Sequence, residues 1–218
     1  MKETTGSREY FNEIASQWNE LQRSYYDESI LIAARKKVPL SPDMVVADIG
    51  AGTGFVSEGI APYVGRVIAL DQSREMLKEM ADKMACLGIN NIEYCEGDQE
   101  NLPLCNNLVN VAYSNMALHH ALNPQKAVRE MARILKPGGW LVITDIDKHL
   151  YEWMLTELHD VWPGFDRADV KGWLEGAGLT SVEVDCVGSE CCATSGTGEG
   201  ARVSIFIAIG QKPDKSIA

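Results

Sequence analysis

Two acidic residues that follow apolar, β-rich runs are the first positions of the sequence with a chemistry to offer. Asp48 lies near the end of the run 44–49, and Asp71, 23 residues later, ends the run 66–71. A helical pattern follows each acid, so both carboxylates are expected at the carboxyl edge of a parallel sheet, where open α/β folds bind ligands. An acid at this place after the second strand can accept both hydroxyls of a ribose. The spacing therefore indicates a site for a nucleotide-like ligand.

The segment DIGAGTG, residues 48–54, supplies the turn between the first strand and its helix. Glycine at alternate positions lets the backbone turn sharply and removes the Cβ atoms that would keep a ligand away. A dinucleotide site would need the pattern GxGxxG, which places a pyrophosphate on a helix N-terminus. Phe55 or Ser57 stands where the third glycine is required, depending on which glycine begins the pattern. The nicotinamide alternative is therefore disfavoured.

These residues lie within a repeated alternation of strand and helix patterns. We predict strands over residues 44–49, 66–71, 92–96, 108–114 and 140–145. We predict helices over residues 54–64, 73–87 and 124–135, with Ser73 as the N-cap of the second and KPGG ending the third. Such alternation implies a mostly parallel, doubly wound sheet of the Rossmann-like α/β class.

The end of the chain follows a different pattern. Helices are predicted over 151–161 and 166–177, and strands over 181–187 and 202–210. The segment between the two strands, GSECCATSGTGEGA, carries turn residues and little hydrophobic periodicity, so we expect a loop there. Two strands joined without a helix suit an antiparallel hairpin. We therefore expect seven strands in all, with an antiparallel C-terminal edge strand.

The N-terminal region is rich in aromatic residues. Residues 8–37 are predicted to be helical, with a second helix over 27–37. The aromatic side chains there are Tyr10, Phe11, Trp18, Tyr25 and Tyr26. They suit either packing against the sheet or a lid over a ligand. We expect a single domain over 1–218, with a helical lid over 1–40 and a flexible tail over 211–218.

Composition restricts the class of partner. The formal net charge is −11 and the pI is about 4.8, which disfavours a broad basic face for nucleic acid or an anionic membrane. The start MKETTGSREYF lacks an apolar core, and no apolar run is long enough to cross a bilayer. We expect a cytoplasmic protein that binds a small molecule, without membrane insertion. The sequence carries no signal for an oligomeric state.

Several motifs in order carry a family resemblance. With DxGxGxG at 48–54, the blocks GDQENLPL (97–104), SNMALHH (114–120) and REMARILKPGGWLVITD (129–145) are similar to class I S-adenosylmethionine-dependent methyltransferases. The resemblance is strongest to the ubiquinone/menaquinone C-methyltransferase group and covers roughly residues 8–146. It implies an enzyme that transfers a methyl group from S-adenosylmethionine to a small molecule and releases S-adenosylhomocysteine.

The resemblance also implies which residues hold the cofactor. These are Tyr10, Trp18, Asp48, Gly50, Ala51, Gly52, Gly54, Asp71, Gln72, Met76, Gly97, Asp98, Gln99 and Ser114. Asp48 would lie near the ammonium group and Asp71 would take the ribose hydroxyls. Asp98 would accept from the adenine amino group, and Ser114 would lie near the transferred methyl.

The acceptor end is less defined by the sequence. His119 and His120 follow the fourth strand and titrate near neutral pH, so they are the candidate catalytic bases, although either could simply order its loop. No metal ligands are assigned. We expect the acceptor to contact the N-terminal aromatic helices, residues 147–166 and the loop 188–202.

The adjacent pair Cys191–Cys192 offers one alternative function. Neighbouring thiolates suit thiophilic centres, and arsenite methyltransferases on this scaffold hold trivalent arsenic with cysteines. Those enzymes use cysteines before the glycine strand and after the fifth strand, where this chain has none. Two ordinary cysteines in a loop is the simpler interpretation, and the other four cysteines are predicted to be buried thiols. A further alternative is a regulatory protein that binds S-adenosylmethionine without turnover.

Overall fold

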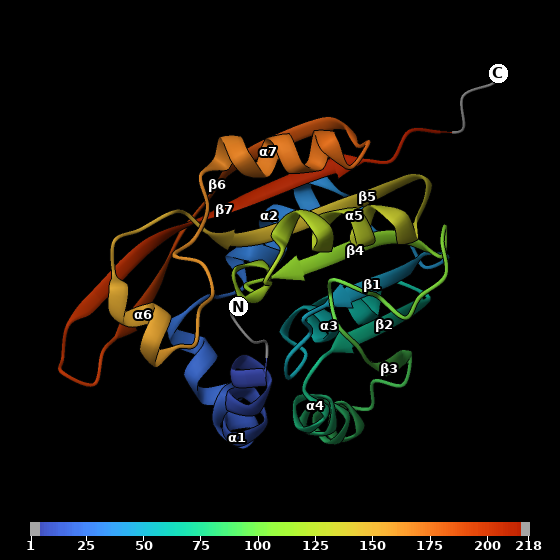
Figure 1. Ribbon diagram of the computed structural model, residues 1–218. Helices are drawn as coiled ribbons and strands as arrows, with labels where there is room; N and C mark the ends of the chain where they lie inside the picture. Colours follow the sequence, from blue (N-terminus) through green and yellow to red (C-terminus); the bar gives the residue numbers. More distant parts are fainter. Residues whose placement is uncertain (1–4, 215–218) are drawn as a thin grey trace.

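The computed structural model describes residues 5–214 and contains a seven-stranded sheet between two layers of helices (Figure 1). The strands are β1 Val45–Ile49, β2 Arg66–Asp71, β3 Ile92–Glu96, β4 Val109–Asn115, β5 Leu135–Ile146, β6 Thr180–Thr194 and β7 Gly200–Gln211. The α-helices are α1 Thr5–Leu21, α2 Ser29–Lys37, α3 Phe55–Ile60, α4 Arg74–Leu87, α5 Pro124–Ile134, α6 Glu152–Glu157 and α7 Arg167–Gly176. Short 3₁₀ turns are η1 Gln22–Ser24, η2 Ala61–Tyr63 and η3 Leu118–His120.

The strand order is β3-β2-β1-β4-β5-β7-β6. Strands β1 to β5 are parallel, and β7 runs antiparallel to both β5 and β6. The predicted fold class is therefore confirmed, although the last strand lies second from the edge and β6 is outermost. The order reverses between β1 and β4, which is the point where open α/β sheets form their binding crevice. The glycine segment after β1 lies at this point.

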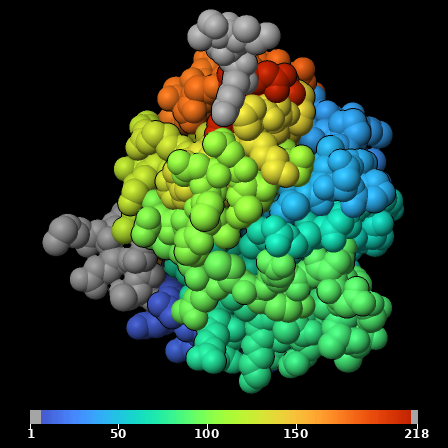
Figure 2. All heavy atoms as spheres, turned by 90° about the vertical axis from the view of Figure 1, so that its right-hand side faces the viewer, coloured from blue at the N-terminus to red at the C-terminus, as the bar shows by residue number. Residues whose placement is uncertain are grey.

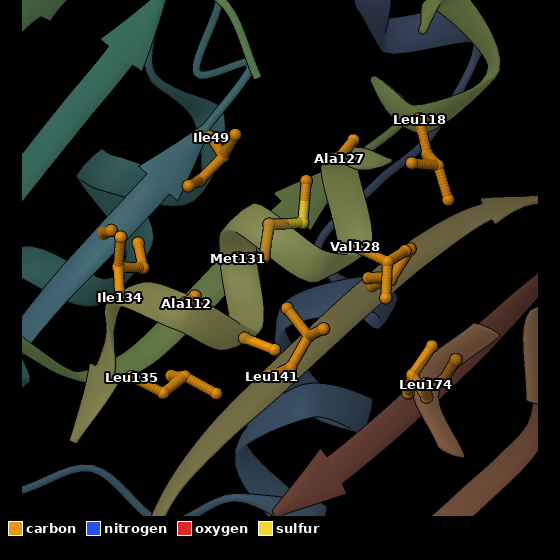
Figure 3. Packing of buried hydrophobic residues seen from close by; sticks show 14 of the residues in the cluster. Ile49, Ala112, Leu118, Ala127, Val128, Met131, Ile134, Leu135, Leu141 and Leu174 are labelled. Atoms are coloured by element: carbon orange, nitrogen blue, oxygen red, sulfur yellow. The ribbon is translucent and has the colours of Figure 1, made fainter. Parts of the chain in front are cut away.

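The core consists of two apolar layers because the central parallel strands are buried on both faces. One layer joins α5 and α7 to residues such as Ile49 and Leu141. Figure 3 shows Met131 of α5 among the side chains of this layer. The other layer joins α2, α3 and α4 to residues such as Val46 and Val142. Successive residues of a strand point to opposite faces, so Val46 and Ala47 belong to different layers.

Two predicted boundaries in the second half of the chain were wrong. Helix α5 ends at Ile134, close to the predicted end, but β5 begins at Leu135 instead of residue 140 and includes the KPGG segment, residues 136–139. Gly138 donates to the Lys212 carbonyl at 2.9 Å, and the Lys212 N–H donates to the Gly139 carbonyl at 2.8 Å. The predicted loop 188–202 is mostly strand. The pairing of β6 with β7 extends as far as Thr194 and Gly200, and its register is irregular between Cys186 and Glu190. The turn-rich composition of this segment hid the strand pattern.

The predicted helix 151–161 is also shorter than expected. Helix α6 ends at Glu157, and His159 has a φ of 57°, which a helix cannot continue through. We expected a flexible tail over 211–218. Gln211 instead belongs to β7, and Lys212 Nζ donates to four acceptors, including the Leu135 carbonyl at 2.8 Å. Residues 215–218 lie outside the described residues.

The remaining elements gather at one end of the sheet. The arrowheads of β4 and β5 point toward α6 and the far half of the β6–β7 hairpin in Figure 1. A third apolar cluster, which includes Ile30, Met154 and Cys191, joins the hairpin to α2 and α6.

On the side of the molecule seen in Figure 2, the cyan-to-green and yellow-to-orange segments form a continuous surface. Among the described residues, no helix is long and apolar enough to cross a membrane.

Candidate functional site

A cavity of about 820 Å³, counted with its mouth, opens at the carboxyl edge of β1, β2 and β4. Eleven of the fourteen predicted cofactor residues line it: Trp18, Asp48, Gly50, Ala51, Gly52, Asp71, Gln72, Met76, Gly97, Asp98 and Gln99. No lysine or arginine is among the described lining residues. We call this space the first cavity.

Asp71 connects the second strand to the glycine segment. Its Oδ2 accepts the Gly52 N–H at 2.8 Å, and its Oδ1 accepts the Ser73 N–H at 2.8 Å. Ser73 in turn caps α4 by accepting the Met76 N–H at 3.1 Å, as predicted. Burial raises the pKa of Asp71, while these backbone hydrogen bonds oppose that rise. The carboxylate is therefore fixed in orientation at the wall of the first cavity.

Asp48 forms the floor of the first cavity and is almost fully buried. Its Oδ2 accepts from the Ser57 backbone N–H at 3.0 Å and from the Ser57 hydroxyl at 2.7 Å. Burial raises the pKa of Asp48 to about 7, with the Ser57 hydrogen bonds opposing and the Asp71 charge adding to the rise. A cationic group in the cavity would favour the charged form of this acid.

Glycine is required at the start of the loop by its close approach to the Ala117 side chain. Gly50 has a φ of +70°, and a Cβ there would lie 2.3 Å from the Ala117 Cβ. Gly54 meets a different constraint, since a Cβ would lie 2.7 Å from Met80 Cγ in the core. Gly54 thus packs on α4 and does not line either cavity described here.

Helix α1 covers the first cavity and is held by polar contacts at three points. Arg8 pairs with Glu96 at 2.7 Å. The Ser73 hydroxyl donates to Asn12 Oδ1 at 2.7 Å. Thr53 donates to Asn19 Oδ1 at 2.8 Å. These contacts tie the helix to the ends of β2 and β3 and to the glycine segment, and they direct Phe11 and Trp18 into the cavity.

Two other predicted residues do not line the first cavity, and Gln99 makes a contact that the sequence did not predict. Tyr10 lines a second cavity instead of the first. Ser114 is buried in β4 and lines neither cavity; Asn115 and Ala117, farther along the chain, line the first. Gln99 donates to the Ala117 carbonyl at 3.0 Å, which leaves its buried Oε1 with no hydrogen-bond partner among the described residues.

The second cavity adjoins the first and is mostly apolar. Five residues line both: Phe11, Trp18, Tyr26, Met116 and His120. The others that line the second are Tyr10, Tyr25, His119, Ile146, Met154, Leu158, Asp160 and Cys191. These residues include members of all three segments in which we expected acceptor contacts, the N-terminal helices, 147–166 and 188–202. The tertiary structure therefore brings the three segments together.

His119 lies between two buried acids. Its Nδ1 is 2.6 Å from Asp145 Oδ1, and its Nε2 is 3.6 Å from Asp160 Oδ1. Burial alone would lower the pKa of His119, but the two carboxylates outweigh it and raise the pKa to about 9. Asp145 is held in turn by the Leu118 N–H at 3.0 Å and the Ile146 N–H at 2.8 Å.

His120 differs from its neighbour. Its Nδ1 is 3.3 Å from the His159 carbonyl oxygen, and its Nε2 is 4.0 Å from Asp160 Oδ1. Burial, followed by the charge of His119, lowers the pKa of His120. The Phe11 ring packs edge-on against the imidazole with centroids 5.0 Å apart.

Two acids of this site were missed from the sequence. Asp145 ends the predicted fifth strand, so the reasoning that selected Asp48 and Asp71 could have found it. Asp160 follows α6 in irregular chain, where no spacing marks it. Burial raises the pKa of Asp160 to about 6, while the His119 charge opposes the rise. The position of Asp160 beside His119 follows only from the packing of this segment against η3.

The cysteine pair does not converge. Cys191 and Cys192 are consecutive in β6 and pair with Val203 and Arg202 in regular register, so their side chains point to opposite faces. Cys191 is 3% exposed and lines the second cavity, whereas Cys192 is half-buried and does not. Adjacent thiols on opposite faces do not offer two ligands to one arsenic. Of the other four, Cys86, Cys105 and Cys186 are exposed and Cys95 is half-buried, so burial was wrongly predicted.

The central region of the chain is similar to known proteins. Residues 47–143 match the family model described as a methyltransferase domain. The chain is 28% identical over 169 residues to a malonyl-[acyl-carrier protein] O-methyltransferase of Marinomonas sp., which covers 73% of this chain and 60% of that protein. It is 32% identical over 121 residues to the ubiquinone/menaquinone biosynthesis C-methyltransferase UbiE of Klebsiella pneumoniae, covering 54% and 48%. The chain spans about half the length of the curated relatives it matches.

Solved structures share the fold. The YcgJ protein of Bacillus subtilis has a TM-score of 0.69 at 19% identity, covering 86% of this chain and 100% of that chain. A SAM-dependent methyltransferase of Aquifex aeolicus has a TM-score of 0.65 at 22% identity, covering 90% and 97%. At these identities the likeness concerns the fold.

Proposed function

We propose that the chain transfers a methyl group from S-adenosylmethionine to a small, largely apolar acceptor, on the premise that residues 47–143 match the family model described as a methyltransferase domain. The observation that carries the proposal is the pair of adjoining cavities at the carboxyl edge of the sheet, which share five lining residues. One cavity has the polar groups that a nucleoside and an amino acid require. The other is aromatic and apolar, as an acceptor site would be.

The residues of the first cavity fit the cofactor. Asp71 and Gln72 would hold the ribose end, and Asp98 with the unpartnered Gln99 Oε1 would receive the adenine amino group. Asp48 would favour the cationic end of the molecule because its own charge is poorly solvated. When bound, S-adenosylmethionine supplies a methyl group already activated on a sulfonium. The protein then has to position the two reactants and exclude water.

The second cavity favours a neutral acceptor with an aromatic or similarly flat body. Its walls include the rings of Tyr10, Phe11 and Trp18, whereas no lysine or arginine is among its described lining residues. An acceptor with a free carboxylate, such as the malonyl group named for one relative, would meet the Asp160 carboxylate with no lysine or arginine among the described lining residues. His119 is already placed between Asp145 and Asp160. A hydroquinone, the substrate class named for a rice relative that is 32% identical over 146 residues, has no such conflict.

The predicted catalytic residues, His119 and His120, line the second cavity together with Asp160. These three are the imidazole and carboxylate groups among the described lining residues, and they can act on the nucleophile of the acceptor. Met116 and His120, which line both cavities, lie where the methyl group must pass. We therefore retain an activating role for the two histidines as part of the proposal.

Calorimetric titration with S-adenosylmethionine, S-adenosylhomocysteine and NAD tests the cofactor half. We expect the first two to bind and NAD not to bind; binding of NAD alone would overturn the assignment. Incubation with methyl-labelled S-adenosylmethionine and a panel of hydroquinones, phenols and carboxylic acids tests the acceptor half. S-adenosylhomocysteine formation with hydroquinones but not with carboxylic acids supports the proposal. Binding without turnover on any acceptor would favour the regulatory alternative.

A further inference from the structure

We propose that His119, His120 and Asp160 bind one divalent transition-metal ion in the wall of the second cavity. This site was not assigned from the sequence, because the acid lies 40 positions beyond the histidine pair. The inference deepens the proposed function, since the ion would lie beside the acceptor. Metal binding can nevertheless be measured without turnover.

The three side chains converge from two separate segments. One ligand atom from each lies within 4.8 Å of the others. Asp160 Oδ1 is 3.6 Å from His119 Nε2 and 4.0 Å from His120 Nε2. Ligand atoms around a tetrahedral ion with bonds of about 2.0–2.1 Å lie roughly 3.3 Å apart. Shifts of less than about 1 Å would therefore complete the coordination.

Both histidines are already oriented as ligands are. A metal-bound imidazole usually donates its other N–H to a carboxylate or a backbone carbonyl, which fixes the ring and its tautomer. His119 Nδ1 meets Asp145 Oδ1 at 2.6 Å, and His120 Nδ1 meets the His159 carbonyl at 3.3 Å. Each contact leaves Nε2 facing the same acid, where it becomes a ligand once an incoming ion displaces any proton it carries. Two adjacent histidines that merely ordered their loop would not require this shared direction.

Asp160 supplies an independent sign of a missing cation. The residue is 8% exposed, and its Oδ2 is buried with no hydrogen-bond partner among the described residues. A buried carboxylate is costly unless a cation or hydrogen-bond donors compensate it. Its contact to His119 is longer than a hydrogen bond, and His119 is already hydrogen-bonded to Asp145. No lysine or arginine is among the described residues that line the cavity. A divalent ion between the three groups would satisfy this acid.

The donor set indicates the class of ion. Two imidazole nitrogens and one carboxylate suit Zn²⁺, Co²⁺, Mn²⁺ or Fe²⁺, whereas Mg²⁺ and Ca²⁺ prefer oxygen ligands. Three protein ligands leave a coordination position for an oxygen of the acceptor. The pKa of such a hydroxyl would fall on coordination, so that its proton is lost to solvent water before methyl transfer. The histidines would then act as ligands and not as bases.

The test begins with the full chain freed of metal by dialysis against a chelator. Zn²⁺, Co²⁺ and Mn²⁺ are added singly, the bound metal is counted by mass spectrometry after desalting, and Co²⁺ binding is followed by visible absorption. We expect one equivalent of Zn²⁺ or Co²⁺ per chain. His120→Gln and Asp160→Asn should lower the affinity at least tenfold, and Asp145→Asn should lower it roughly 10- to 100-fold.

Two controls match these variants. His159→Gln changes an exposed imidazole but retains the backbone carbonyl that faces His120, and Asp166→Asn changes an exposed acid nearby. Both should bind metal as the wild type does. Each variant is also titrated with S-adenosylmethionine to show that it is folded.

A wild-type chain that binds no Zn²⁺ or Co²⁺ at micromolar concentration overturns the metal site. So does an affinity that His120→Gln and Asp160→Asn leave unchanged, or full methyl transfer by the chelated enzyme, which would mean that the cluster contacts the acceptor directly. In each case retained binding of S-adenosylmethionine would leave the proposed function intact. Loss of that binding in the wild type would instead contradict the proposed function itself.

Discussion

Asp71 Oδ2 accepts the backbone N–H of Gly52 at 2.8 Å and thereby joins the end of β2 to the glycine segment that follows β1. One carboxylate therefore both shapes the loop and forms part of the wall behind it. A substitution of Asp71 would therefore change both the glycine loop and the wall of the first cavity.

Asp71→Ala should weaken the binding of S-adenosylmethionine by roughly 10- to 100-fold. A hydrogen bond to a charged group contributes about 1.5–3 kcal/mol, and the variant loses the bond to Gly52 as well as any bond to the ribose. Calorimetric titration measures the change. Glu93→Gln, on the exposed face of β3, is the control and should bind normally. An unaltered dissociation constant for Asp71→Ala would show that the ribose lies elsewhere.

Gly50→Ala should destabilise the fold by more than about 2 kcal/mol. The new Cβ would lie 2.3 Å from Ala117 Cβ, and the φ of +70° adds strain for any L side chain. Gly172→Ala is the matched control, because it lies inside α7 with nothing within 4 Å of the added atom. That change should stabilise by about 0.5–1 kcal/mol. Thermal unfolding compares the two, and equal shifts would refute the close packing of the glycine loop on Ala117.

Asp48 should make the stability of the ligand-free protein depend on pH. Its pKa is about 7 in the folded chain against 3.8 without burial, so its favourable contribution is present below pH 3.8 and is lost as the pH rises through 7. Asp48→Asn removes this dependence. The free energy of unfolding of the variant, relative to that of the wild type, should rise between pH 5 and 7 and level off above pH 8. Over the whole range from pH 3.8 to 8 the rise is at most roughly 4 kcal/mol.

Urea unfolding of both proteins at several pH values checks this prediction. Ser57 can still donate to the amide oxygen of Asp48→Asn, so the local hydrogen bonds are largely retained. A difference in unfolding free energy that does not vary with pH would contradict the effect of burial on Asp48.

Helix α1 should become more protected when S-adenosylmethionine binds. Phe11 and Trp18 line both cavities, and a ligand between them and the sheet would hold the helix in place. Hydrogen exchange of residues 5–21 should slow on addition of the cofactor, while that of α7, on the opposite end of the core, stays unchanged. Equal exchange of α1 with and without ligand would show that the helix is core and not a lid.

Much of the first cavity was determined by the sequence, because its contacts are local. The predicted strands at 66–71 and 92–96 agree with β2 and β3, and Ser73 caps α4 as expected. In a parallel sheet, a residue at the carboxyl end of a strand has to meet its counterparts from neighbouring strands. The positions of Asp48 and Asp71 follow from strand periodicity and glycine spacing alone.

The second cavity, which we propose to hold the acceptor, was decided only by tertiary structure. Asp160, Cys191 and Tyr10 lie far apart in the chain and meet because α1, the segment after α6 and the β6–β7 hairpin pack over one end of the sheet. No periodicity encodes such a meeting, since it depends on how far the hairpin extends and on where α6 ends. The hydrophobic pattern of a helix or strand predicts which of its faces is buried. Which other element covers that face depends on long-range packing, which the pattern does not contain.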